Sequence, residues 1–196
     1  AQVAAQESEE RYRLLFQSAP VAMAARDAPA LKQYLETLQA SGIVDLEAYL
    51  REHPQQIGRC MALIKTVDCN DAFMALIEAE DKAAILADLP RVVMGTDFQR
   101  MAQEIIVMVA QGRFLPEREM TIQTVDGRIK RVMSRAMVLA GHETTMARVV
   151  ISLVDISTRV AAEEALRASE RRFREQALHD NLTGLYNQRY LHHSLP

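Results

Sequence analysis

The chain has 196 residues and a formal net charge of −3 at pH 7, and 49% of its residues are hydrophobic. This length suits one domain with helical additions, or one domain plus a fragment of another, and the apolar content is sufficient to bury a core. The charge balance argues against a nucleic-acid surface, which needs clustered excess Lys and Arg.

Membrane and secretion signals are also missing from the sequence. No apolar run approaches the roughly 20 residues that span a bilayer, and the opening AQVAAQESEE lacks the basic start and apolar stretch of a signal peptide. Two cysteines, Cys60 and Cys69, are too few for a disulfide framework and fit a reducing compartment. Because the chain does not begin with Met, we expect a fragment of a longer protein. The cysteine content leads us to expect that the fragment is cytoplasmic.

The first third of the chain predicts two helical regions around a short strand. Residues 5–18 carry apolar side chains at helical spacing, and residues 21–26 are short and apolar, as in a buried strand. Residues 28–58 predict a small helical block, with Asp45 capping its second helix and Pro54 starting a third, shorter turn.

The middle of the chain predicts one strand and three helices. Residues 62–69 have the β-branched content of a strand, and Asn70 then provides a capping signal for the next helix. A short helix is expected at 80–88, ending before Pro90, and a longer one at 97–111.

Beyond residue 116 the apolar period changes from about 3.6 to 2, which indicates strands. The segments 117–125 and 128–139 flank an Asp126-Gly127 hairpin turn, and a third strand is expected at 145–154. The chain therefore predicts an α+β fold with a three-stranded antiparallel meander.

A long helix is expected at 158–178, because this segment contains no Gly or Pro. Ala162, Leu166, Ser169 and Phe173 follow the 4-3-4 spacing of a coiled-coil seam. A single solvated helix is the alternative. We favour a homodimer, because a lone polar helix of this length needs a partner surface.

The predicted sheet presents two apolar faces. Alternation places eight residues on one face: Met120, Ile122, Val132, Ser134, Ala136, Val149, Ile151 and Leu153. Ser134 is the only clear polar contact among them, so this face forms either a packed core, which we favour, or the wall of a site for a small apolar ligand. The opposite face carries Met133, Met137, Val150 and Val154, and we expect Leu15 and Phe16 or a dimer partner to cover it.

Four segments resemble PAS domains, in the order of that family. ESEERYRLLFQSAPVAM resembles the opening, TVDCNDAFMALIEAED the second strand and the helix after it, EREMTIQTVDGRIKRVMSRAMV the later hairpin, and VVISLVDISTRVAAEEALRASERRFR the closing strand and exit helix. Together they cover most of residues 7–175. The resemblance implies a PAS-like antiparallel sheet with flanking helices, whose inner face lines the ligand cavity.

The helical block at about 28–60 departs from that family pattern. It resembles an insertion seen in some bacterial sensor kinases and cyclases. Two roles are open for it: a lid on the pocket, or a packing addition.

The stretch ALHDNLTGLYNQRYL, residues 177–191, resembles the start of a GGDEF (diguanylate cyclase) domain. Gln188 departs from the usual Arg, and the matching residues are Asp180, Leu182, Thr183, Gly184, Leu185, Asn187, Arg189 and Tyr190. A helix cap at Asp180 or Asn181 is the simpler alternative. The resemblance implies that the GTP and Mg²⁺ sites lie beyond Pro196, so this chain would have no catalytic residues of its own.

The sequence gives little support for a bound haem, flavin or metal ion. Haem needs an axial His, and the five histidines, His53, His142, His179, His192 and His193, fall in the helical block, a turn and the C-terminal segments. The NCRFLQ motif of flavin-adduct PAS domains is absent, and Cys69, like Cys60, fits a buried small hydrophobe. We therefore expect no haem, no flavin and no metal site.

These patterns predict four parts: an N-terminal helix (1–19), a PAS sensor domain (20–156), a linker helix (157–179) and a truncated GGDEF start (180–196). We expect a dimeric sensor that relays a signal through Asp155, Leu166 and Phe173 to an attached diguanylate cyclase. The alternative is a ligand-free PAS platform for dimerisation or protein interaction.

Overall fold

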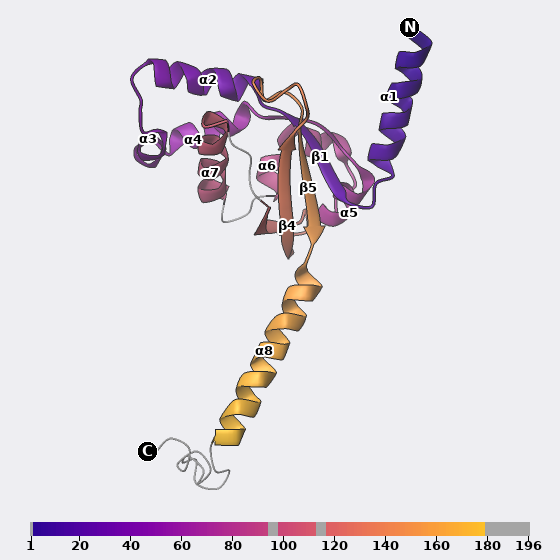
Figure 1. The fold of residues 1–196 in the computed structure, drawn as a ribbon, viewed down its shortest axis with the longest axis vertical. Coiled ribbons are helices and arrows are strands. Elements are labelled where there is room, and N and C mark those ends of the chain that lie inside the picture. The colour runs from indigo at the N-terminus through magenta and orange to yellow at the C-terminus, as the bar shows by residue number, and fades with distance from the viewer. Residues whose placement is uncertain (1, 94–97, 113–116, 179–196) are drawn as a thin grey trace. The chain divides into compact units, whose positions relative to one another are not determined.

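A five-stranded antiparallel sheet organises the first part of the chain in this computed structural model, which describes residues 2–93, 98–112 and 117–178 (Figure 1). The chain divides into two units, Ala1–Asp155 and Ile156–Pro196. The strands follow the order β2-β1-β5-β4-β3. Their bounds are β1 Ala22–Asp27, β2 Lys65–Cys69, β3 Arg118–Gln123, β4 Ile129–Val138 and β5 Val149–Asp155. The predicted meander is confirmed as β3, β4 and β5.

The last strand begins later than the sequence predicts. Residues 145–148 form no strand, because Met146 and Arg148 adopt positive φ angles of 54° and 60°. The carbonyl of Met146 accepts a hydrogen bond from the Ala28 N–H (3.0 Å), and the Arg148 N–H donates to Asp27 Oδ1 (3.0 Å). These contacts hold the segment as a loop against the end of β1.

Seven helices accompany the sheet in the described part of the first unit. They are α1 Gln2–Gln17, α2 Pro29–Ala40, α3 Leu46–Glu52, α4 Gln55–Ala62, α5 Asp71–Ile77, α6 Lys82–Val93 and α7 Phe98–Ala110. The predicted helical block is confirmed as α2–α4, with Asp45 accepting a hydrogen bond from the Ala48 N–H (2.9 Å). The predicted stop before Pro90 is wrong, because α6 continues to Val93. Proline has a helix-compatible φ and costs a hydrogen bond rather than ending this helix.

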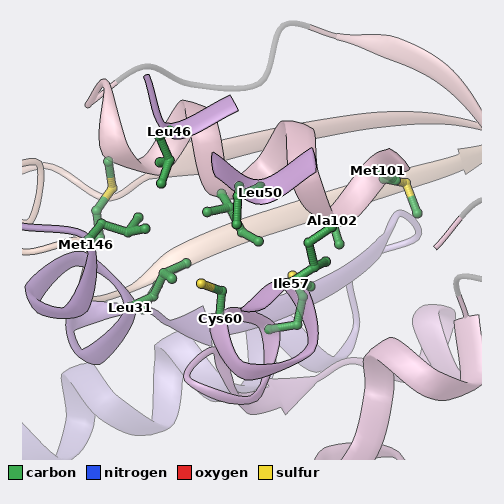
Figure 2. Close-up of a cluster of buried hydrophobic side chains, with 12 residues drawn as sticks. Leu31, Leu46, Leu50, Ile57, Cys60, Met101, Ala102 and Met146 are labelled. Atoms are coloured by element: carbon green, nitrogen blue, oxygen red, sulfur yellow. The ribbon is translucent and has the colours of Figure 1, made fainter. Parts of the chain in front are cut away.

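The helical block packs against α7 rather than against the sheet. Leucines of α2 and α3 meet α4 and α7 in one buried cluster (Figure 2). Among its members Leu31, Leu50, Cys60 and Ile106 are fully buried. Ile105 and Val109 of α7 pack on this cluster and also line one of the cavities described below. Both roles expected for the insertion, a lid or a packing addition, stay predictions.

Helices α5 and α6 cover the inner face of the sheet. Phe73 and Ile77 from α5 and Ile85 from α6 pack with sheet residues such as Ile122 and Leu153 in a second buried cluster. Burial at alternate positions of β1 and β4 matches the predicted two-residue period.

The side-chain amide of Asn70 joins three segments at the start of β1. Its Oδ1 accepts hydrogen bonds from the N–H groups of Met23 and Phe73, both at 2.9 Å. Its Nδ2 donates to the carbonyls of Phe16 (3.1 Å) and Val21 (2.8 Å). The residue is fully buried, so it acts as the N-cap of α5 and also as the tie between α1, β1 and α5.

The outer face of the sheet stays partly open. Met137 and Val154 are exposed, and Leu15 on α1 is 66% exposed while Phe16 is buried. The expectation that Leu15 covers this face is therefore wrong for the single chain, since that side chain points into solvent. A dimer partner, the other expected cover, stays a prediction.

The second unit contains the predicted long helix, α8, at Ser157–Leu178. Leu166 and Phe173 of the expected seam are 62% and 69% exposed. The expected GGDEF start, Asp180 to Tyr190, lies outside the described residues. Within the described ranges, none of the helices combines the length and apolar character that a bilayer crossing requires.

Replacing Asn70 with Ala tests the tie at the start of β1. The change removes four side-chain hydrogen bonds to backbone groups of three segments, and we expect the free energy of unfolding to fall by about 3 kcal/mol in urea denaturation. Asp45→Ala is the matched control, because it removes an exposed N-cap that accepts a hydrogen bond from the Ala48 N–H, and it should cost about 1 kcal/mol. Equal losses in the two variants would contradict the role assigned to Asn70.

Candidate ligand-binding site

Two small cavities lie between the inner face of the sheet and α7. Their volumes are about 50 Å³ and about 70 Å³. Both are lined by Arg26 from β1, Ile105 from α7, Ala136 from β4 and Ile151 from β5. The shared walls make them neighbouring compartments of one site.

The structure brings most of the predicted face residues to these cavities. The first cavity is lined by Met120, Ile122, Ser134, Ala136, Ile151 and Leu153, and the second by Ala136, Val149 and Ile151. Val132 is fully buried in the neighbouring core cluster and lines neither cavity. The role of these residues as ligand contacts stays a prediction.

Arg26 is the functional candidate that the sequence reasoning missed. Its residue is only 6% exposed, and its Nε has no hydrogen-bond partner in the described part of the chain. Burial lowers the pKa of its guanidinium well below its ordinary value, to about 10, because a low-dielectric site disfavours the charged form. The group is therefore still a cation at neutral pH.

The local strand geometry explains why an Arg points inward here. Ala22, Ala24 and Arg26 are the buried positions of β1, so the two alanines leave space beside the longer side chain. The pairing with β2 shifts register between Ala25 and Arg26, leaving Val67 without a Cα partner in β1. Such bulges twist a strand locally and re-aim side chains. Two-residue alternation along AMAARD could have revealed Arg26, because it places this residue on the same face as Ala22 and Ala24.

The inner face is therefore more polar than the sequence predicts. Ser134 is not its only polar contact, because Arg26 and Arg118 also line the first cavity. Arg118 has a partner, since its Nη1 forms an ion pair with the Glu104 carboxylate. Arg26 carries the unbalanced charge of this site.

The expectation of no haem and no flavin stays a prediction. Cys60 and Cys69 are both buried and line neither cavity. Burial raises the pKa of Cys60 to about 11 and also raises that of Cys69, which disfavours a reactive thiolate. Among the described residues, no His, Cys, Asp and Glu cluster could hold a metal ion.

Strand β5 runs from the cavities to the second unit. Ile151 and Leu153 line the site, Asp155 ends the strand, and α8 starts two residues later at Ser157. Leu166 and Phe173, the other predicted relay residues, lie on α8 and contribute nothing to the cavities.

Comparison with known proteins identifies the fold. A light-oxygen-voltage (LOV) protein from Rhodobacter sphaeroides is 14% identical, with 84% of this chain and 76% of that chain covered and a TM-score of 0.53. The chain has the PAS/LOV fold. An RNA-binding LOV receptor is also similar, at 13% identity over 83% of this chain but only 37% of that one, with a TM-score of 0.56. The PAS domain of a Colwellia psychrerythraea protein shows 17% identity, with 76% and 97% covered and a TM-score of 0.49.

No protein-family model matches the sequence, and no curated protein matches it. The PAS/LOV fold confirms the predicted α+β class, with its antiparallel sheet and flanking helices.

Replacing Arg26 with Met tests whether this buried charge is a cost to the fold. The change removes the unpartnered charge, and we expect the free energy of unfolding to rise by about 3 kcal/mol, close to the free-energy equivalent of the lowered pKa. Arg135→Met on the exposed side of β4 is the control and should change stability by less than about 0.5 kcal/mol. A loss of stability in Arg26→Met would show that Arg26 has a structural partner.

Proposed function

We propose that this chain is a signal-sensing PAS module that regulates an attached diguanylate cyclase through a dimeric linker helix. The observation that carries the sensing part is the inner-face site, in which a buried cation borders cavities lined by β5. Ligand sites in proteins combine apolar walls with few polar groups in this way. The PAS/LOV fold supports the same role, since its known members include sensor domains.

The signal route follows β5. A ligand in the cavities would contact Ile151, whose strand continues through Asp155 towards α8. The opposite edge of β5 pairs with β4 along Val132 to Val138, so a shift at the cavity reaches the hairpin as well. Packed elements with two discrete arrangements pass small shifts over such distances.

The dimer is proposed from the exposed apolar residues of α8. Leu166 and Phe173 fall at coiled-coil spacing. Both apolar side chains are exposed to water in the single chain, which is unfavourable. Two copies of α8 packed along this seam would bury them. The exposed Met137 and Val154 on the outer sheet face offer a second region for the same pairing.

The output is proposed from the motif in residues 177–191, which resembles the start of a GGDEF domain. In this proposal the linker sets how two cyclase domains meet, each bringing one GTP to form cyclic di-GMP. The Mg²⁺ and GTP sites then belong to that following domain, and residues 1–196 alone turn over no GTP.

A ligand-free platform is the second candidate function. The small volume of the cavities and the close packing of Ile122 and Val132 favour it, because a filled core serves a purely structural dimer. This candidate shares the α8 seam with the first and differs in having no occupant on the inner face.

The seam is tested by Phe173→Glu. A charge at the centre of the helix pair must be desolvated, so we expect the dimer of residues 1–196 to weaken at least about tenfold in analytical ultracentrifugation. Ala168→Glu is the control, since it adds the same charge at an exposed position off the seam. In a chain extended through the cyclase domain, Phe173→Glu should also change cyclic di-GMP synthesis.

Two outcomes bear on this proposal differently. Unchanged oligomeric state and unchanged synthesis in Phe173→Glu would contradict the relay. Weakened dimerisation with unchanged synthesis would leave the dimer and remove its link to the cyclase.

A further inference from the structure

We propose that the inner-face site binds a short-chain monocarboxylate, with the carboxylate on the guanidinium of Arg26 and the apolar tail against Ile105 and Ile151. This inference rests on the proposed sensing function and adds the chemical class of the ligand. Folding alone does not explain why a charged side chain, that of Arg26, stands at this position of the sheet.

The unbalanced charge is the first argument. Arg26 is buried, its Nε has no partner, and no ion pair reaches its side chain from the described residues. A buried unpaired cation is costly, and the cost is relieved by an anion that also accepts its hydrogen bonds. A carboxylate suits this task because it matches the planar fork of a guanidinium.

The number of charges limits the ligand to a monoanion. The other cation at the first cavity, Arg118, is already paired with Glu104. A dicarboxylate or a phosphate would bring a second negative charge into a site that has no free cation to balance it. The hydroxyl of Ser134 adds one polar contact and no charge.

The walls and the volume define the rest of the molecule. Apart from Arg26, the second cavity is lined only by aliphatic and Met side chains, among them Ile64, Met108 and Val109. Compartments of about 50 and 70 Å³ accept a few carbon atoms, well below a fatty acid. The best match is a carboxylate with a short tail of about two or three carbon atoms.

The same contacts connect this ligand to the signal route. Arg26 pairs with Val149 of β5, and Ala24 pairs with Ile151, so the head group and the tail contact two adjacent strands. Binding would therefore fix β1 against β5 at the cavity.

Isothermal titration calorimetry on residues 1–196 tests the inference with propionate as the probe. Propionamide is the neutral control of the same shape, and succinate is the dianion control. We expect propionate to bind about 10- to 100-fold more tightly than the amide, because it adds charge-assisted hydrogen bonds. Arg26→Met should weaken propionate binding by a similar factor, and Arg26→Lys should retain part of it, since the charge remains.

The control variant is Arg135→Met, which lies on the exposed face and should bind as the original chain does. Equal affinity for propionate and propionamide, with Arg26→Met unaffected, would overturn the anion and leave the sensing function intact. Binding of neither probe, with Arg26→Met folded, would overturn the monocarboxylate, whereas the relay is judged separately by Phe173→Glu. Preference for succinate would overturn the limit to one charge.

Discussion

The buried amide of Asn70 is the constraint on which the arrangement of the sheet depends. It binds backbone groups from the end of α1, the start of β1 and the first turn of α5, in a region largely shielded from water, where unpaired backbone groups are costly. Strand β1 lies between β2 and β5, so its position decides whether five strands form one sheet. Fixing β1 at its first residues also fixes the direction in which its later side chains point.

Arg26 is the most consequential of those side chains. A protein core normally pairs a buried charge, and this one lies among Ala24, Ile105 and Ile151 with its Nε unpartnered. Stability and the proposed function therefore favour different side chains at this residue. An apolar side chain would stabilise the core more, whereas the guanidinium would bind an anionic ligand. Strained or costly groups of this kind gather where proteins bind ligands.

Much of the fold was predictable because short-range rules act on contiguous residues. Alternation identified the inner face, and the capping residues Asp45 and Asn70 were found because an N-cap acts within three residues of its helix. Arg26 was missed because the alanines of β1 made the strand look uniformly apolar, and the lack of a partner is a property of the assembled core. The late start of β5 has the same origin, since Met146 is held by packing and by Ala28, far away in the sequence.

We propose that occupancy of the inner-face site changes the conformation of β5 and α8. Hydrogen–deuterium exchange of the original chain and of Ala136→Val tests it without knowledge of the ligand, because Ala136 lines both cavities and the added methyl groups occupy part of their volume. We expect altered amide exchange along Val149–Asp155 and in the first turns of α8. Changes confined to β3 and β4, with β5 and α8 exchanging as before, would contradict it.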